Sequence, residues 1–235
     1  MGNYKGIIFD LDDTLFDTSS QLIGPAITAA CKAMLNAGLN GSLPDCVAQY
    51  HLFTSENLRK DFFSFIVPQL GLRSPNLDPR QISQLGRLTF LRPHLPPTLE
   101  LIAGARELLD HLKNHAPLFL VTAGDRETQQ AKVAKLSIES DFTEILYVAP
   151  HLGERKQQSF LQILNRLRTT QNVEPQEVLC IGNRVDSEIS EGNELGFHTC
   201  LVRHGEHRGQ KPLNAQETPT FMVENIRDII STCRI

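Results

Sequence analysis

Residues 5–15 read KGIIFDLDDTL, an apolar run that stops at a cluster of carboxylates. The run up to Phe9 is typical of a buried strand, and Asp10 and Asp12 follow directly after it. Open α/β sheets hold their sites at the carboxyl ends of such strands. Carboxylates this close repel one another unless a cation compensates, and no soft ligand is near in the sequence. The stretch therefore predicts a strand-end site for a hard cation such as Mg²⁺, in preference to a solvated turn.

The strand pattern recurs along the chain, with helical periodicity between several of the apolar runs. Four further runs predict strands: residues 118–121 before Thr122, 145–148 before Ala149, 178–181 before Gly182, and 199–202. Apolar stripes predict helices over residues 98–115 and 157–168. This alternation predicts an α/β fold, with a Rossmann-like parallel sheet core and helices on both faces.

Residues 17–92 break the alternation. Apolar spacing predicts one helix over residues 22–34, a second that begins at Thr54 or Ser55, and a third after Asp78. The segment is therefore expected to be an insertion in the α/β fold. The predicted domains are an α/β catalytic core, residues 1–16 and 93–235, and a small all-helical domain, residues 17–92.

Composition narrows the class of function. A chain of 235 residues with 40% hydrophobic content can bury one core and a smaller accessory domain. The net charge of -4 argues against nucleic acid or an anionic membrane as a partner. No apolar run approaches the roughly 20 residues that span a bilayer, and the first residues do not resemble a signal peptide. A cytoplasmic enzyme is expected, and the five scattered cysteines are given no function.

The stretch GIIFDLDDTL resembles the first motif of the haloacid dehalogenase (HAD) superfamily, whose members are mostly phosphatases. Three further motifs of that family have counterparts in the same order: Thr122 closing a strand, Lys156 ahead of a helix, and residues 181–189, IGNRVDSEI. The resemblance covers essentially the whole chain. It implies that the helical insertion between the first two motifs is a cap domain.

The resemblance also implies roles for individual residues. Asp10 would be the nucleophile that forms an aspartyl-phosphate, and Asp12 the acid/base partner. Thr122, Ala123 and Lys156 would bind the phosphate group. The metal residues, for Mg²⁺, would be Asp10, Asp12, Asn183 and Asp186. Lys156 competes for its role with Lys132, Lys135 and Arg155, because Gln157 replaces the proline that commonly follows the family's lysine.

The fourth motif departs from the family pattern, which begins Gly-Asp, because Asn183 follows Gly182. An amide still offers an oxygen ligand but removes one negative charge, which should weaken Mg²⁺ binding. Asp186 and Glu188 are close enough to compensate, and Glu188 occupies the place of the family's second acidic residue in this motif.

The predicted function is a Mg²⁺-dependent phosphatase of a small phosphorylated metabolite. Three alternatives remain. One is a catalytically weakened HAD-like protein with a phosphate-ester-binding or regulatory role. Another is a phosphomutase, which the motifs barely distinguish from a phosphatase. A dehalogenase is the third, although its chemistry leaves Asp12 without a purpose.

Overall fold

The computed structural model describes residues 4–56 and 61–235. The chain divides into two compact units, one of residues 1–18 and 97–235 and the other of residues 19–96. The assignment of these units as catalytic core and cap stays a prediction. Within the described ranges, no helix combines the length and apolar character needed to cross a bilayer.

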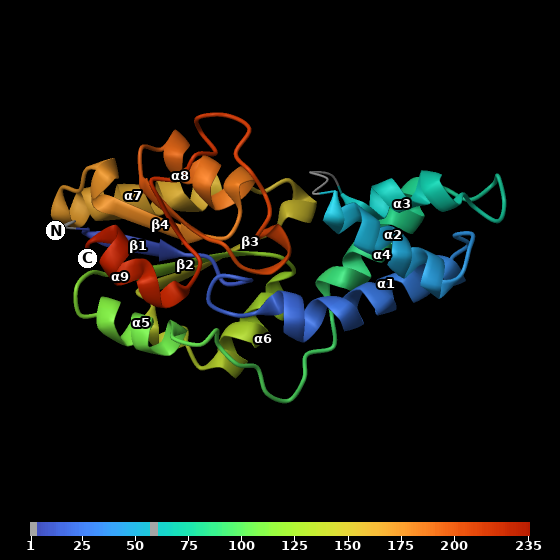
Figure 1. The fold of residues 1–235 in the computed structure, drawn as a ribbon, viewed down its shortest axis with the longest axis horizontal. Helices are drawn as coiled ribbons and strands as arrows, with labels where there is room; N and C mark the ends of the chain where they lie inside the picture. The colour runs from blue at the N-terminus through green and yellow to red at the C-terminus, as the bar shows by residue number, and fades with distance from the viewer. Residues whose placement is uncertain (1–3, 57–60) are drawn as a thin grey trace. The chain divides into compact units, whose positions relative to one another are not determined.

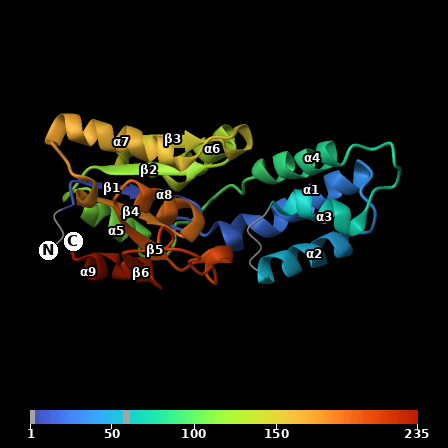
Figure 2. The same ribbon diagram turned by 90° about the horizontal axis from the view of Figure 1, so that it is seen from above.

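The first unit is built on a parallel sheet. The central strand β1 (Gly6–Phe9) pairs with β2 (Leu118–Ala123) and β4 (Val178–Gly182). The remaining strands are β3 (Glu144–Val148), β5 (His198–Val202) and β6 (Phe221–Val223), and the six lie in the order β3-β2-β1-β4-β5-β6 (Figure 2). The predicted α/β fold is confirmed, and β6 is an additional edge strand.

Helices cover both faces of this sheet. α7 (Lys156–Gln171) and α8 (Ser190–Glu194) lie on one side, and α5 (Ala105–Leu112) and α9 (Ile229–Cys233) lie on the other (Figure 1). α6 (Arg126–Leu136) follows β2 directly. On the α7 face, Ile8 and Phe119 of the sheet share one core cluster with Phe160 and Leu164 of α7.

The prediction of a helix from residue 98 was wrong, because α5 begins only at Ala105. Gly104 precedes it in the left-handed region at φ 97°, which starts the helix there. Leu101 instead forms an isolated bridge with Phe16, so residues before Gly104 pack on the loop after β1.

In its described residues, 19–56 and 61–96, the second unit has four α-helices, not the three that were predicted. They are α1 (Gly24–Asn36, preceded by a π-helical turn, Ser19–Ile23), α2 (Leu43–Ser55), α3 (Phe62–Leu70) and α4 (Pro79–Leu91). Thr54 and Ser55 end α2 and do not start a helix, because their hydroxyls bond carbonyls of the preceding turn. Ser42 and Asp45 form the capping box that begins α2, and Asp61 caps α3.

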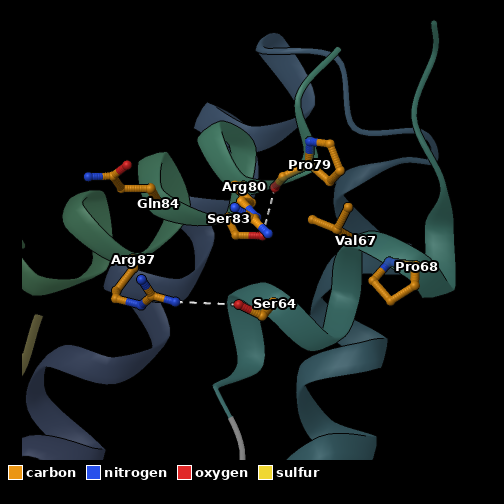
Figure 3. A pocket seen from close by; sticks show the side chains of 8 residues that line it. All are labelled: Ser64, Val67, Pro68, Pro79, Arg80, Ser83, Gln84 and Arg87. Carbon is orange, nitrogen blue, oxygen red and sulfur yellow. Dashed lines mark hydrogen bonds between the residues drawn. The ribbon is translucent and has the colours of Figure 1, made fainter. Parts of the chain in front are cut away.

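A groove of about 380 Å³ lies between α3 and α4 within the helical unit (Figure 3). Arg87 crosses it, with Nε 3.0 Å and Nη2 2.6 Å from the two carboxylate oxygens of Asp61. Nη2 also lies 3.4 Å from Ser64 Oγ. This bidentate pair joins the N-terminus of α3 to the middle of α4.

Gly86 allows α4 to approach its neighbours closely. A Cβ there would lie 2.4 Å from Met34 Sδ and 2.8 Å from Phe63 Cδ1. Alanine raises helix propensity by about 1 kcal/mol, but overpacking costs about 1–3 kcal/mol. We expect Gly86→Ala to lower the free energy of unfolding by up to about 2 kcal/mol in denaturant titration. The exposed Gln81→Ala in α4 should change it by less than about 0.5 kcal/mol, and a stabilised Gly86→Ala would contradict the close packing.

Candidate active site

Asp10 lies at the carboxyl end of the central strand. Ile7, Ile8 and Phe9 are fully buried, and the Asp10 N–H donates to Ile181 O at 3.0 Å, which continues the pairing with β4. The Asp10 residue is only 6% exposed. The strand therefore holds the Asp10 carboxylate at the carboxyl ends of the parallel strands, where the sequence predicted it.

Lys156 brings two carboxylates together. It is the first residue of α7, and its Nζ lies 2.5 Å from Asp10 Oδ1 and 2.6 Å from Glu188 Oε1. All three residues are buried. One ammonium thus bridges the first and fourth motifs, which favours Lys156 over the other basic residues considered for the third motif.

The three buried charges shift one another. Burial raises the pKa of Asp10 to about 7, and the charges of Glu188 and Asp12 add to this, while Lys156 opposes it. Burial alone would lower the pKa of Lys156, but Asp10 and Glu188 outweigh it and raise that pKa. The ammonium is thus firmly charged, and one positive charge does not fully compensate two carboxylates.

Asp12 is held by three donors. Lys132 Nζ lies 2.7 Å from Oδ1, Gln129 Nε2 lies 2.7 Å from Oδ2, and the Thr18 hydroxyl donates to Oδ1. Although burial raises the pKa of Asp12, the charge of Lys132 and these hydrogen bonds outweigh it and lower that pKa. The carboxylate is therefore fixed in orientation and ionised.

Thr122 and Ala123 close β2, as the sequence indicated. Thr122 is fully buried, and its Oγ1 lies 2.5 Å from Gln129 Nε2. The same nitrogen lies 3.3 Å from Ala123 O. One amide therefore links the end of β2 to Asp12.

The fourth motif follows β4 and forms a π-helical turn, Val185–Ile189. Glu188 folds back over the strand end, where a Cβ on Gly182 would lie 2.3 Å from its Cγ, so glycine is required at that position. Asp186 instead pairs with Arg184, at 3.1 Å and 3.2 Å. Asn183 is 3% exposed. Among the described residues, neither Asn183 nor Asp186 bonds Asp10 or Asp12.

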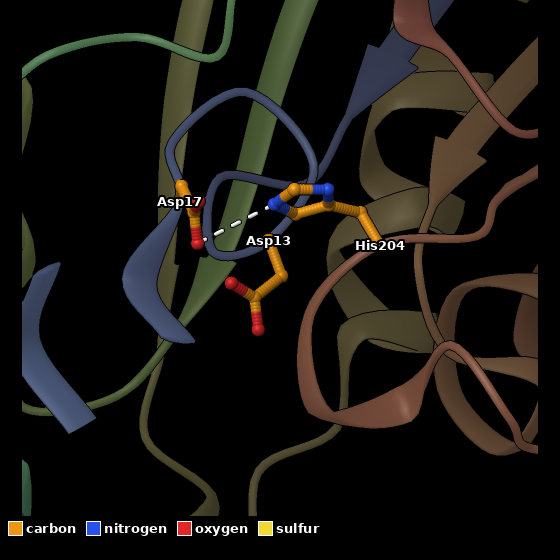
Figure 4. A group of neighbouring side chains, drawn as sticks. All are labelled: Asp13, Asp17 and His204. Carbon is orange, nitrogen blue, oxygen red and sulfur yellow. Dashed lines mark ion pairs between the residues drawn. The ribbon is translucent and has the colours of Figure 1, made fainter. Parts of the chain in front are cut away.

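A further group lies beside the loop that follows β1. His204 Nε2 lies 3.3 Å from Asp17 Oδ1, and Asp13 lies next to this pair (Figure 4). One ligand atom from each of the three lies within 4.8 Å of the others, and a Cβ on Gly205 would lie 2.1 Å from Asp13 Oδ2. The segment after β5 is thereby held against the first motif.

Sequence reasoning gave no role to Gln129 or Thr18, and named Lys132 only as an alternative to Lys156. The signal that marks the two α6 residues is their spacing. Gln129, Lys132, Val133 and Leu136 form the buried face of α6 at positions i, i+3, i+4 and i+7. Polar side chains at core positions of an amphipathic helix indicate buried polar partners.

A family model described as haloacid dehalogenase-like hydrolase matches residues 4–196. The chain belongs to this family. One curated relative of this HAD-like hydrolase is the glyceraldehyde 3-phosphate phosphatase of Methanopyrus kandleri, 25% identical over 98% of this chain and 97% of the relative. The protein of that name from Methanocaldococcus jannaschii is 26% identical over 96% and 95%.

Solved structures show the same fold. The magnesium-bound HAD-hydrolase YfnB from Bacillus subtilis gives a TM-score of 0.65 at 21% identity, over 97% of this chain and 98% of that chain. A HAD-like family hydrolase from Xanthomonas campestris gives 0.63 at 22% identity, over 100% and 96%. The predictions of HAD membership, of the HAD fold and of a phosphatase-type HAD-like hydrolase are confirmed.

Proposed function

We propose that this HAD-like hydrolase removes the phosphoryl group from a small phosphorylated metabolite through an aspartyl-phosphate on Asp10. The observation that carries the proposal is the buried Asp10 carboxylate at the end of β1, with Oδ1 2.5 Å from the Lys156 ammonium. The other oxygen, Oδ2, accepts from the Thr14 hydroxyl at a long 3.5 Å and carries no ion pair, so it is the one placed to attack phosphorus in line. Forming the aspartyl-phosphate splits a difficult hydrolysis into two easier displacements.

The remaining residues have distinct parts in this reaction. Binding of the anionic ester beside Asp12 would raise the pKa of this carboxylate, which then takes up a proton from solvent. As a bond forms between Asp10 and phosphorus, the ester P–O bond breaks and Asp12 gives that proton to the departing oxygen. Asp12 then takes a proton from the water that attacks phosphorus, so that inorganic phosphate leaves and Asp10 is restored. Thr122, Ala123 and Lys156 would bind the phosphoryl oxygens, with Lys156 as a fixed positive charge.

The residues present fit a hard cation. Asp10 and Glu188 are two buried carboxylates that share one ammonium, so this cluster carries a net negative charge when both are ionised. Mg²⁺ would supply charge compensation for the phosphoryl oxygens. Asp10, the Asp12 backbone carbonyl and Asn183 would hold it.

The acidic partner of these three residues would come from the fourth motif. Glu188 is a better candidate than Asp186. It shares the Lys156 ammonium with Asp10, whereas Asp186 is engaged by Arg184. Because Glu188 lies near Asp10, its charge also replaces the one that Asn183 lacks.

The two relatives that match over nearly the whole chain suggest the substrate class. Both are named for glyceraldehyde 3-phosphate, so we extend the proposal to a three-carbon phosphate ester or a similarly short one. The helical unit, in the place of the family's cap, would select among such esters and exclude water.

The test is phosphate release from purified protein with Mg²⁺ and after removal of metal with EDTA. The panel contains glyceraldehyde 3-phosphate, phosphoglycolate, a hexose phosphate, a nucleoside monophosphate and p-nitrophenyl phosphate. We expect hydrolysis that is fastest on the short esters and falls at least about 100-fold without metal. Binding of these esters without turnover would overturn the proposal and favour the binding-protein alternative, with Asn183 as the cause.

A further inference from the structure

Two buried polar side chains of α6 have no part in the reaction described above. Gln129 is 2% exposed and Lys132 is 5% exposed, at positions that would otherwise suit apolar residues. Burying an ammonium or an amide costs free energy unless it is bound to a partner. Their presence at core positions of a helix calls for a reason other than packing.

Both side chains end on Asp12. Lys132 Nζ binds Oδ1 at 2.7 Å, and Gln129 Nε2 lies 2.7 Å from Oδ2. Gln129 Nε2 also lies 2.5 Å from Thr122 Oγ1, so it fixes the carboxylate relative to the end of β2. Asp125 accepts from Thr128 N at 3.2 Å and caps α6, which holds the start of the helix that carries both residues.

The geometry distinguishes the two oxygens of Asp12. Oδ1 receives both Lys132 and Thr18 and carries the fixed ion pair. Oδ2 receives only the amide of Gln129. Because its described donor is a neutral amide and not an ammonium, Oδ2 is the oxygen better able to hold a proton and exchange it with the ester oxygen.

We propose that Gln129 and Lys132 are positioning residues that aim Asp12 Oδ2 at the leaving-group oxygen. They thereby make the enzyme competent on alkyl phosphate esters, whose leaving groups are strongly basic. The inference rests on the proposed function, since it assumes phosphoryl transfer to Asp10. A general acid contributes about 10²–10⁴-fold, and a misplacement of about 1 Å loses about 10²-fold.

The effect must depend on the leaving group. When the P–O bond breaks, an alkoxide needs the Asp12 proton, whereas nitrophenolate is a weak base and leaves without it. The ratio kcat/KM covers steps up to transfer of the phosphoryl group to Asp10. The later attack of water, in which Asp12 serves as base, does not enter it.

The experiment compares kcat/KM on glyceraldehyde 3-phosphate and on p-nitrophenyl phosphate for Lys132→Met and Gln129→Leu. We expect a loss of about 10–100-fold on the alkyl ester and less than about 3-fold on the aryl ester. Lys135→Met and Gln130→Leu are the matched controls, because both residues are exposed on the same helix. Each control should leave both values within about 2-fold of wild type.

Lys132→Met removes the positive charge that pairs with the buried Asp12, and the variant could fail to fold. A second measurement keeps the test decisive in that case. Gln129→Leu, which removes no charge, then carries the comparison alone. In an Asp12→Asn background, a further Gln129→Leu change should have no additional effect on the alkyl ester. Equal losses on both esters, or additive losses in that background, would mean a merely structural role and overturn the inference.

The proposed function fails separately. Wild type that hydrolyses neither ester, or Asp10→Asn protein that hydrolyses both normally, would reject phosphoryl transfer to Asp10. An Asp10-dependent enzyme whose α6 variants show no selectivity between leaving groups would reject only the positioning role.

Discussion

Asp10→Asn protein is expected to release phosphate at least about 10⁴-fold more slowly than wild type, on alkyl and aryl esters alike. An amide is a poor nucleophile toward phosphorus, and a good leaving group does not replace the missing attack. The fold should survive, because asparagine preserves the shape and Glu188 still pairs with Lys156 at 2.6 Å. Removing one of two buried carboxylates that share an ammonium also relieves repulsion between them.

Three measurements define this result. Steady-state phosphate release gives the loss of activity, and thermal unfolding shows whether the variant is folded. Rapid quenching of the wild type, followed by mass spectrometry, should find one phosphoryl group on the peptide that contains Asp10. A folded Asp10→Asn enzyme that keeps more than about one tenth of wild-type activity would assign the nucleophile elsewhere.

Glu188→Gln is expected to raise the Mg²⁺ concentration for half-maximal activity by about 10–100-fold. The physical reason is the negative charge of Glu188, which lies beside the ammonium that also binds Asp10. Asn183 is neutral and supplies no negative charge to attract Mg²⁺. Asp186→Asn, in the same motif, should shift the Mg²⁺ requirement by less than about 3-fold. The Asp186 carboxylate pairs with the partly exposed Arg184 and not with the groups around Asp10. Exposed ion pairs of this kind contribute little to stability, so losing this one should also leave the protein folded.

A readout that does not depend on turnover checks this comparison. Mg²⁺ that binds the folded protein raises the temperature of unfolding. The shift at a fixed Mg²⁺ concentration should shrink in Glu188→Gln and persist in Asp186→Asn. The opposite order would restore Asp186 as the acidic partner of Asp10 at the metal.

Strands β1 to β5 could be predicted because each contains a short apolar run, whereas the three-residue edge strand β6 could not. The helical insertion was predicted less well, since Thr and Ser hydroxyls bond carbonyls at the end of a helix as readily as they cap its start. Thr54 and Ser55 do the former, and Ser42 with Asp45 does the latter at α2. The apolar stripe over residues 98–115 also predicted too long a helix. In the structure α5 begins only after Gly104, which has a left-handed backbone conformation.

By itself, the sequence determined the positions of Asp10, Asp12, Thr122 and Lys156 at the ends of strands or the start of a helix. Local apolar patterning is sufficient for that, because it sets where each element stops. Only the tertiary structure decided which charges meet. Lys156 reaches Asp10 across 146 positions of chain, and Lys132 reaches Asp12 across 120. Such pairs depend on the order of strands in the sheet and on the buried face of α6, and no local pattern specifies either.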